Sequence, residues 1–180
     1  MKSKALIIGN SDGIGLAITT KLLAEGWQIT GISRSESLIE HPSCQHFMAN
    51  VQEPDYPEKL KTILDAENPY DVCMYCVGIG EHIDFSEMEN DVQVMDVNLL
   101  GMVKTVAQVI PKMLENGKGH FLGISSFADE LLSDEAPGYH ASKAGFSNYL
   151  ESLALSLKST PVDITNVRSD LWILKWRKVM

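Results

Sequence analysis

Residues 4–15, KALIIGNSDGIG, decide the fold of this 180-residue chain. The apolar run from Lys4 to Gly9 is typical of a buried β-strand, and apolar residues at helical spacing follow over Ile14–Glu25. The turn between them has its glycines in the spacing G-x-x-x-G-x-G. Glycines let the backbone turn tightly and approach a pyrophosphate at the N-terminus of the next helix. This stretch therefore predicts a nucleotide-binding turn, with the candidate contacts Gly9, Ser11, Asp12, Gly13, Ile14 and Gly15.

Strands and helices continue to alternate along the rest of the chain. We expect strands at Trp27–Ser33, Phe47–Val51, Asp71–Val77, His120–Ser125 and Val162–Val167. We expect helices at Pro57–Ala66, Asp91–Glu115 and Tyr139–Lys158, with a loop at Ser126–Gly138. This order predicts an α/β fold: a Rossmann-like, doubly wound parallel sheet of about six strands with helices on both faces.

The composition is that of one ordinary globular domain, with 44% hydrophobic and 22% charged residues. The 24 acidic and 15 basic residues give a formal net charge of −9. That balance argues against binding to nucleic acid or to an anionic membrane surface. No apolar run approaches the ~20 residues of a membrane-spanning helix. We expect a cytoplasmic protein with no nucleic-acid or membrane partner.

The chain has three cysteines, Cys44, Cys73 and Cys76, and an odd number in a chain that looks intracellular does not indicate a disulfide framework. Cys73 and Cys76 form a C-x-x-C pair, but a zinc site usually needs a second pair of ligands. In a strand, residues three apart point to opposite faces. We interpret both as core residues and expect no metal site, with a redox or metal protein as a remote alternative.

A second group of polar residues indicates proton transfer. Tyr139 and Lys143 are four residues apart in a predicted helix and so share one face. A phenol has a pKa of ~10, and a nearby ammonium lowers it, which equips the phenol to exchange a proton with a carbonyl or hydroxyl. Ser126 follows the fifth strand, at the edge where open parallel sheets bind ligands. Asn98 lies inside the long helix, where it reads on its own as a surface or kink residue.

Together these residues resemble the short-chain dehydrogenase/reductase family. The resemblance runs from Lys4 to about Arg168 and rests on Gly9-x-x-x-Gly13-x-Gly15, Asn98, Ser125-Ser126 and Tyr139-x-x-x-Lys143. It implies hydride transfer between NAD(P) and an alcohol/carbonyl pair.

The resemblance also implies a role for each matching residue. Tyr139 would be the general acid/base, and Lys143 would bind the nicotinamide ribose and tune the phenol. Ser126 would orient the substrate oxygen, and Asn98 would hold a water in the proton relay. His140, beside Tyr139, is interpreted as a helix residue that faces away from the site.

The end of the second strand bears on the choice between NAD and NADP. NAD enzymes tend to have an acidic residue there, whereas this chain has Ser33 followed by Arg34. A guanidinium suits a 2′-phosphate, which favours NADP(H), although Asp12 stands where some NADP-using relatives have a basic residue. The remaining candidate cofactor contacts are Asn50 and Val51, where the family usually has an adenine-contacting aspartate, and Gly78.

The C-terminal residues depart from the family pattern. Relatives continue past the sixth strand with a Pro-Gly turn, substrate-covering helices and a seventh strand, whereas this chain has SDLWILKWRKVM over residues 169–180. We interpret residues 1–168 as a dinucleotide-binding domain and 169–180 as a tail outside the pattern. One permitted back-translation of the tail, read in another phase, encodes Gly-Phe-Val-Asp-Thr, which many relatives have at this point. Our hypothesis is a single-base deletion near Arg168 that truncated a longer reductase.

Two functions remain open from the sequence. The favoured one is an NADP(H)-dependent oxidoreductase that interconverts a small-molecule carbonyl and an alcohol. The alternative is a truncated, catalytically weak remnant that binds nucleotide or associates with itself, because a missing substrate lid removes water exclusion. In relatives, the helices matching Asp91–Glu115 and Tyr139–Lys158 pair across a two-fold axis, which implies a homodimer.

Overall fold

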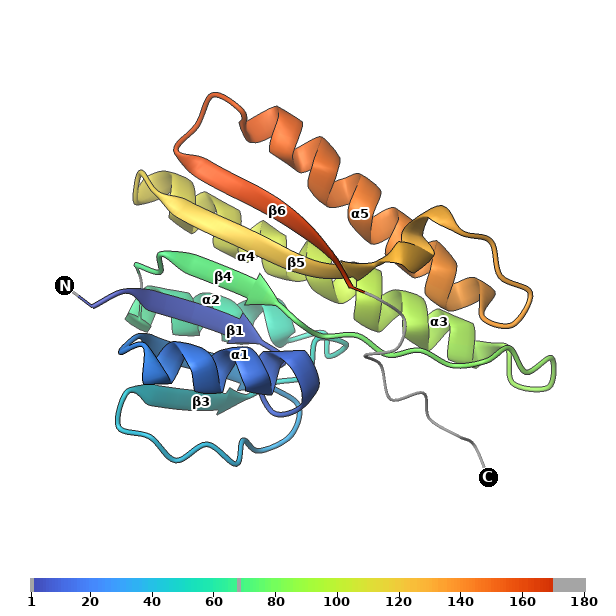
Figure 1. Ribbon diagram of the computed structural model, residues 1–180, viewed down its shortest axis with the longest axis horizontal. Helices are drawn as coiled ribbons and strands as arrows, with labels where there is room; N and C mark the ends of the chain where they lie inside the picture. Colours follow the sequence, from blue (N-terminus) through green and yellow to red (C-terminus); the bar gives the residue numbers. More distant parts are fainter. Residues whose placement is uncertain (1, 68, 170–180) are drawn as a thin grey trace.

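The computed structural model describes residues 2–67 and 69–169. Its strands form one sheet in the order β3-β2-β1-β4-β5-β6, and every neighbouring pair is parallel (Figure 1). The strands are β1 (Lys4–Ile8), β2 (Gln28–Ser33), β3 (Cys44–Met48), β4 (Val72–Tyr75), β5 (Gly119–Ser126) and β6 (Val162–Ser169). The helices are α1 (Gly13–Ala24), α2 (Tyr56–Glu67), α3 (Glu89–Met95), a π-helical turn η1 (Asp96–Leu100), α4 (Gly101–Glu115), a 3₁₀ turn η2 (Phe127–Glu130) and α5 (Pro137–Leu157). The predicted Rossmann-like fold is confirmed.

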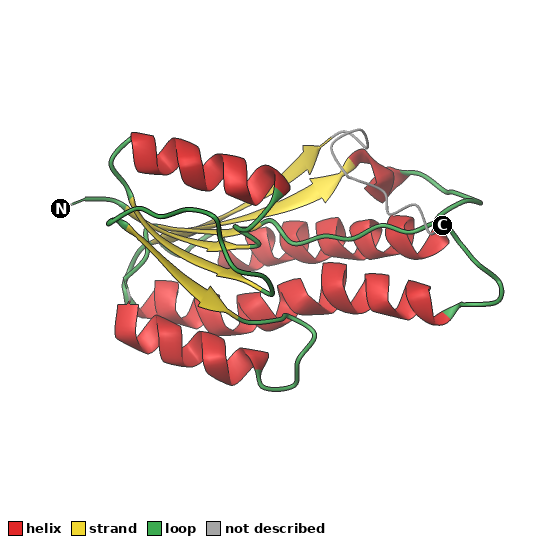
Figure 2. Ribbon diagram, turned by 90° about the horizontal axis from the view of Figure 1, so that it is seen from below, coloured by secondary structure: helices red, strands yellow, loops and turns green. Residues whose placement is uncertain are grey.

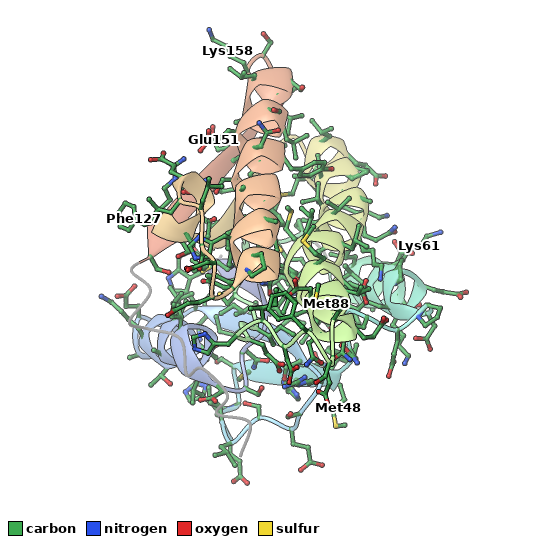
Figure 3. The ribbon with its side chains drawn as sticks, turned by 90° about the vertical axis from the view of Figure 1, so that its right-hand side faces the viewer. Met48, Lys61, Met88, Phe127, Glu151 and Lys158 are labelled. Atoms are coloured by element: carbon green, nitrogen blue, oxygen red, sulfur yellow. The ribbon has the colours of Figure 1, made fainter. Side chains whose placement is uncertain are left out.

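Helices cover both faces of the sheet, as predicted (Figure 2). Alternate residues of β1 point to opposite faces, so Ala5 and Ile7 pack with Leu23 of α1 while Leu6 and Ile8 belong to the larger core. That larger core contains buried residues of α2, α4 and α5. The two faces of the sheet are covered unequally at β5. Phe121 on one face is fully buried, whereas Leu122 and Ile124 on the other face are only partly buried.

The strand order places the ligand-binding edge. β1 lies between β2 and β4: the chain runs outward from β1 through β2 to β3 and then crosses back past β1 to β4. Parallel sheets of this kind bind ligands outside the carboxyl ends of the strands at that reversal point. The glycine turn after β1 lies at this point and begins α1.

One predicted strand was displaced by three residues. We expected Phe47–Val51, but β3 is Cys44–Met48 and pairs with Ile29–Ser33. The pairing with β2 decides the register, and β3 is an edge strand that tolerates polar residues. After Met48 the chain leaves the sheet, and Asn50 Oδ1 accepts a hydrogen bond from the backbone N–H of Gln52. The buried apolar residue Val51 belongs to that turn, not to a strand.

The long helix expected at Asp91–Glu115 begins two residues earlier, at Glu89, and is interrupted by η1. A π turn inserts an extra residue into a helix and is frequent at functional sites. Pro111 lies inside α4, which continues to Glu115. The loop expected at Ser126–Gly138 contains η2, and α5 begins at Pro137 because proline suits the first turn of a helix.

The helical run Glu89–Glu115 is long and apolar enough to cross a membrane by those two criteria alone. Half of its apolar window is buried inside the protein, which is typical of a core helix.

β6 continues to Ser169, two residues beyond the predicted end of the strand, and Ser169 pairs with Ser126 of β5. The predictions for the tail over residues 170–180 and for the missing seventh strand lie outside the described residues.

Candidate active site

The glycine turn aims the N-terminus of α1 at the carboxyl edge of the sheet. Gly9 has a φ of +93°, a left-handed conformation that glycine adopts without strain. The side chain of Asp12 caps α1 by accepting a hydrogen bond from the Gly13 N–H at 2.7 Å. A Cβ at Gly15 would lie 2.0 Å from the Gly9 carbonyl oxygen, so only glycine permits this contact.

A cavity of about 500 Å³ opens beside this turn. Its volume lies within the range of small-molecule sites. The predicted cofactor contacts that line it are Gly9, Ser11, Asp12, Gly13, Ile14, Ser33, Arg34, Asn50, Val51 and Gly78. The structure thus brings ten candidates from four separate segments of the chain to one cavity. Gly15 lies behind them, at the contact between α1 and β1.

The wall of the cavity at the end of β2 is a hydrogen-bonded turn. Ser33 Oγ donates to the Ser35 carbonyl oxygen at 2.7 Å, and His46 Nε2 donates to the same oxygen at 3.1 Å. Arg34, between the two serines, is exposed and lines the cavity. The hydrogen bonds to Ser35 therefore hold a turn that carries the exposed guanidinium of Arg34 at the cavity.

The residues predicted for proton transfer are not among those that line the cavity, although Lys143 and Asn98 lie next to Gly78 in its lining. Tyr139 and Lys143 lie on one face of α5 and are both buried, with the Lys143 Nζ 5.9 Å from the centre of the Tyr139 ring. Lys143 Nζ donates to the Ile124 carbonyl oxygen of β5 at 3.0 Å. Ser126 ends β5, and its Oγ accepts from the Ala128 N–H at 3.2 Å, which begins η2.

Burial drives the pKa values of these two side chains in opposite directions. Desolvation raises the pKa of Tyr139, and a hydrogen bond with Ser126 partly opposes that rise. Desolvation lowers the pKa of Lys143 to about 8, against the attraction of Asp129 and Cys76. Lys143 was expected to lower the pKa of the phenol, but the pKa of Tyr139 is raised because desolvation is the largest effect.

Asn98 is a buried clamp on the loop after β4, not a surface residue of a helix. Its Oδ1 accepts from the Ile79 N–H at 2.8 Å, and its Nδ2 donates to the Ile79 carbonyl oxygen and to Ser142 Oγ, each at 2.9 Å. Because the π turn rotates Asn98 into the interior, its amide joins β4 to α5. This places the backbone of Gly78 and Ile79 next to the proton-transfer residues.

A dinucleotide fits the shape and charge of this arrangement. A Cβ at Gly78 would lie 3.6 Å from Lys143 Nζ and 3.7 Å from Asn98 Oδ1, so the bare backbone leaves room in front of the lysine. The N-terminus of α1 suits an anionic group at the other end of the cavity. The cavity therefore has an anion-binding end at α1, and Gly78 in its lining lies next to Lys143 and Asn98.

The two cysteines of the C-x-x-C pair lie on opposite sides of the sheet, as predicted. Cys73 packs in the larger core, and Cys76 packs against the cluster beneath α1. Burial raises the pKa of the Cys76 thiol to about 12. The described residues contain no group of three or more histidine, cysteine or acidic side chains that could hold a metal ion.

Two buried polar residues near the site, Asn10 and Asp129, were not predicted from the sequence. Asn10 is fully buried in the glycine turn, where its amide packs against Gly31 of β2. Asp129 lies in η2 with its side chain only 1% exposed. A glycine in mid-strand was the available signal for Asn10, whereas nothing in the local sequence distinguishes Asp129 from a surface acid.

His140 bonds to the loop after η2, and its ring meets the Tyr139 ring edge-on, with the ring centres 5.9 Å apart. Its Nδ1 lies 2.9 Å from the Leu131 carbonyl oxygen, in the loop that follows η2. Since a carbonyl oxygen only accepts, His140 donates from Nδ1 in this contact. The imidazole thus ties the loop to α5.

The fold and this constellation define a nucleotide-binding α/β protein with a serine, a tyrosine and a lysine at the carboxyl edge of its sheet. Residues 3–170 match the family model described as short chain dehydrogenase. The chain belongs to the short-chain dehydrogenase/reductase family, whose members are NAD(P)-binding oxidoreductases.

Individual relatives show the same match over most of this chain. It is 29% identical to a glycine betaine reductase of Emericella nidulans over 93% of its length, and 29% identical to a very-long-chain 3-oxoacyl-CoA reductase of Pyricularia oryzae over 98%. It covers 14% and 58% of those two proteins, respectively. A short chain dehydrogenase from Leptospira borgpetersenii, solved with bound NAD⁺, superposes with a TM-score of 0.86 at 19% identity, over 94% of this chain and 71% of that one.

Asn98→Ala tests the clamp on the loop after β4. The substitution leaves the Ile79 N–H, the Ile79 carbonyl and Ser142 without their amide partner, so we expect a loss of about 2 kcal/mol in the free energy of unfolding. Urea denaturation measures it. The control is Asn90→Ala, which removes an exposed amide that bonds to Glu87 and should change stability by less than about 0.5 kcal/mol. Equal losses in both variants would contradict the clamp.

Proposed function

We propose that this protein is an NADPH-dependent reductase that converts a small-molecule carbonyl compound to an alcohol. The observation that carries the proposal is the placement of Tyr139 and Lys143 on one face of α5, with Tyr139 bonded to Ser126 and Lys143 next to Gly78 in the cavity lining. A bound nicotinamide cofactor would supply the hydride. The protein would supply a proton donor, a cation and a hydrogen bond to the substrate oxygen.

The protonation state of Tyr139 suits donation of a proton to a carbonyl oxygen. Because desolvation raises its pKa, the Tyr139 phenol is protonated at neutral pH and can donate to a carbonyl oxygen that gains negative charge. Ser126 would hold that oxygen by hydrogen bond. Lys143, as the ammonium, would stabilise the phenolate that remains and bind the nicotinamide ribose.

Charge at the end of β2 supports NADP over NAD. The cavity wall there contains Ser33 and Arg34 and no carboxylate to accept from a ribose 2′-hydroxyl. The hydrogen bonds of Ser33 and His46 to Ser35 hold the turn so that Arg34 can meet a 2′-phosphate. Asp12 caps α1 on the same cavity and is the feature that opposes this preference.

The proposal extends to the assembly and to the place of the protein in the cell. We propose that residues 1–168 form the dinucleotide-binding domain and that two copies pair through α4 and α5, whose exposed apolar side chains include Leu114 and Leu155. Cys44, Cys73 and Cys76 are all free thiols, which suits the cytoplasm.

Tyr139→Phe should abolish NADPH-dependent reduction of carbonyl compounds and leave NADPH affinity nearly unchanged, because the phenol supplies the proton and little of the cofactor contact. Lys143→Ala should impair both. Fluorescence titration measures binding, and oxidation of NADPH against a panel of ketones measures turnover. Parallel loss of binding and turnover in Tyr139→Phe would contradict the assigned role. Binding without turnover in the unmodified protein would select the nucleotide-binding remnant instead.

Arg34→Ala should weaken NADPH binding by roughly ten- to a hundredfold, which corresponds to the ~1.5–3 kcal/mol of a charge-assisted contact. NADH lacks the 2′-phosphate, so its dissociation constant should change little. The matched control is Lys21→Ala, which removes a cation from the far end of α1. A similar effect of Arg34→Ala on both cofactors would rule out the NADP assignment.

Sedimentation at micromolar concentration should show a dimer. Leu155 is 76% exposed on α5, so Leu155→Glu should weaken association at least about tenfold, equivalent to ~1.4 kcal/mol. A two-fold interface doubles each change, since the same patch occurs on both subunits. Leu38→Glu, at an 88% exposed loop position, is the control and should leave association unchanged. A monomer at this concentration would refute the pairing.

A further inference from the structure

The π turn η1 takes one backbone carbonyl out of the usual helical pattern. In an α-helix the N–H of Gly101 would donate to the Val97 carbonyl oxygen, four residues back. It donates instead to the Asp96 carbonyl oxygen, five residues back. The Val97 oxygen accepts a hydrogen bond from the Tyr75 hydroxyl of β4 at 2.8 Å. A phenol from the sheet thus takes the place of the helical N–H.

The bare backbone of Gly101 makes room for this hydroxyl. Tyr75 is fully buried, and a Cβ at Gly101 would lie 2.5 Å from its hydroxyl oxygen and 2.8 Å from Val51. Glycine is a poor helix former, so a close approach is the physical reason for its place at the start of α4. The Tyr75 ring also packs on Phe146 of α5, with the ring centres 6.1 Å apart. Three elements, β4, α4 and α5, therefore fix the position of the hydroxyl.

The hydrogen bond to Val97 also orients the next residue, Asn98. The Val97 carbonyl and the Asn98 Cα lie in one planar peptide unit, so holding that oxygen fixes the direction from which the Asn98 side chain projects. The Asn98 amide bonds to the N–H and the carbonyl oxygen of Ile79 and to Ser142. Ile79 and Val97 both line the cavity. Hydrogen bonds and one rigid peptide thus connect the Tyr75 hydroxyl to the cavity wall.

We propose that Tyr75 is a positioning residue: its hydroxyl maintains the π turn and thereby directs the Asn98 amide at Ile79, in the wall of the cavity. Without the hydroxyl, the Val97 oxygen would be buried and unpaired, which is costly. The N–H that a regular helix would offer to it is that of Gly101, so the turn would relax toward an α-helix and the Asn98 amide would move away from Ile79. The binding arm of the test rests on the proposed function, whereas the exchange arm does not.

The exchange arm measures amide hydrogen exchange by NMR in the ligand-free full-length protein. Tyr75→Phe keeps the ring and removes the hydroxyl. The Ile79 N–H, which donates to Asn98 Oδ1, should then exchange at least about tenfold faster. The matched control is Tyr56→Phe, which removes another buried hydroxyl of the same core, bonded at 2.7 Å to Thr105 of α4. Its Ile79 rate should stay within about twofold of the unmodified protein.

A double variant separates this role from general support of the core. Asn98→Ala removes the acceptor of the Ile79 N–H, so in that background Tyr75→Phe should add less than about twofold to the exchange rate. Fully additive effects would mean that Tyr75 acts by another route and would overturn the proposal. An unchanged Ile79 rate in Tyr75→Phe, or an equal acceleration in Tyr56→Phe, would also overturn it.

Gly101→Ala is the second variant, and it decides if Tyr75→Phe does not fold. Its Cβ would push the hydroxyl away from the Val97 oxygen instead of removing the hydroxyl. The Ile79 N–H should again exchange faster, and Asn98→Ala should again remove most of the difference. An unchanged Ile79 rate in Gly101→Ala would contradict the proposed role of Tyr75.

The binding arm is a fluorescence titration with NADPH. Because Ile79 lines the cavity, the Kd for NADPH should rise at least about threefold in Tyr75→Phe and stay unchanged in Tyr56→Phe. Faster exchange at Ile79 in a protein that binds neither NADPH nor NADH would refute the proposed function and leave the role of Tyr75 standing. Faster exchange with an unchanged Kd for NADPH would overturn that role for the cofactor.

Discussion

The contact between Gly15 and the backbone of Gly9 is the constraint on which the site depends. α1 approaches β1 so closely that a Cβ at Gly15 would lie 2.0 Å from the Gly9 carbonyl oxygen and 3.2 Å from the Cβ of Cys76. The helix can therefore begin directly over the ends of β1 and β4, at the reversal point of the sheet. This position turns the N-terminal end of α1 into one wall of the cavity. The candidates that follow β2, β3 and β4 line the same cavity because parallel strands end at a common edge.

α5 supplies the second half of the site by its attachment to β5. Along one face, Tyr139, Lys143 and Ser147 each contact a different part of the β5–η2 segment: the Ser126 hydroxyl, the Ile124 carbonyl oxygen, and the Ser125 hydroxyl with Asp129. The helix also packs closely, since a Cβ at Gly123 would lie 2.4 Å from Leu150. The spacing of the reactive groups thus follows from the packing of one helix on one strand.

The features that could be predicted from the sequence are those with a repeating apolar pattern or a fixed spacing between residues. The alternating apolar runs predicted the sheet, and the spacing of Tyr139 and Lys143 predicted a shared helical face. Prediction failed for features that depend on contacts with residues far away in the chain. Pairing with β2 places β3 three residues earlier than predicted. A π turn, which has no apolar pattern in the local sequence, places Asn98 in the core. Asp129 looked like a surface acid because its partners Ser147 and Arg168 are 18 and 39 residues away.

Burial has opposite consequences for the roles proposed for Tyr139 and Lys143. Desolvation favours the neutral form of each: it raises the pKa of Tyr139 and lowers that of Lys143. A proton donor to a carbonyl oxygen needs the neutral phenol, so desolvation assists Tyr139. The ammonium needs its charge, so desolvation opposes Lys143. Each shift is opposed by its surroundings: a hydrogen bond with the Ser126 hydroxyl lowers the pKa of Tyr139, and the nearby Asp129 and Cys76 raise the pKa of Lys143.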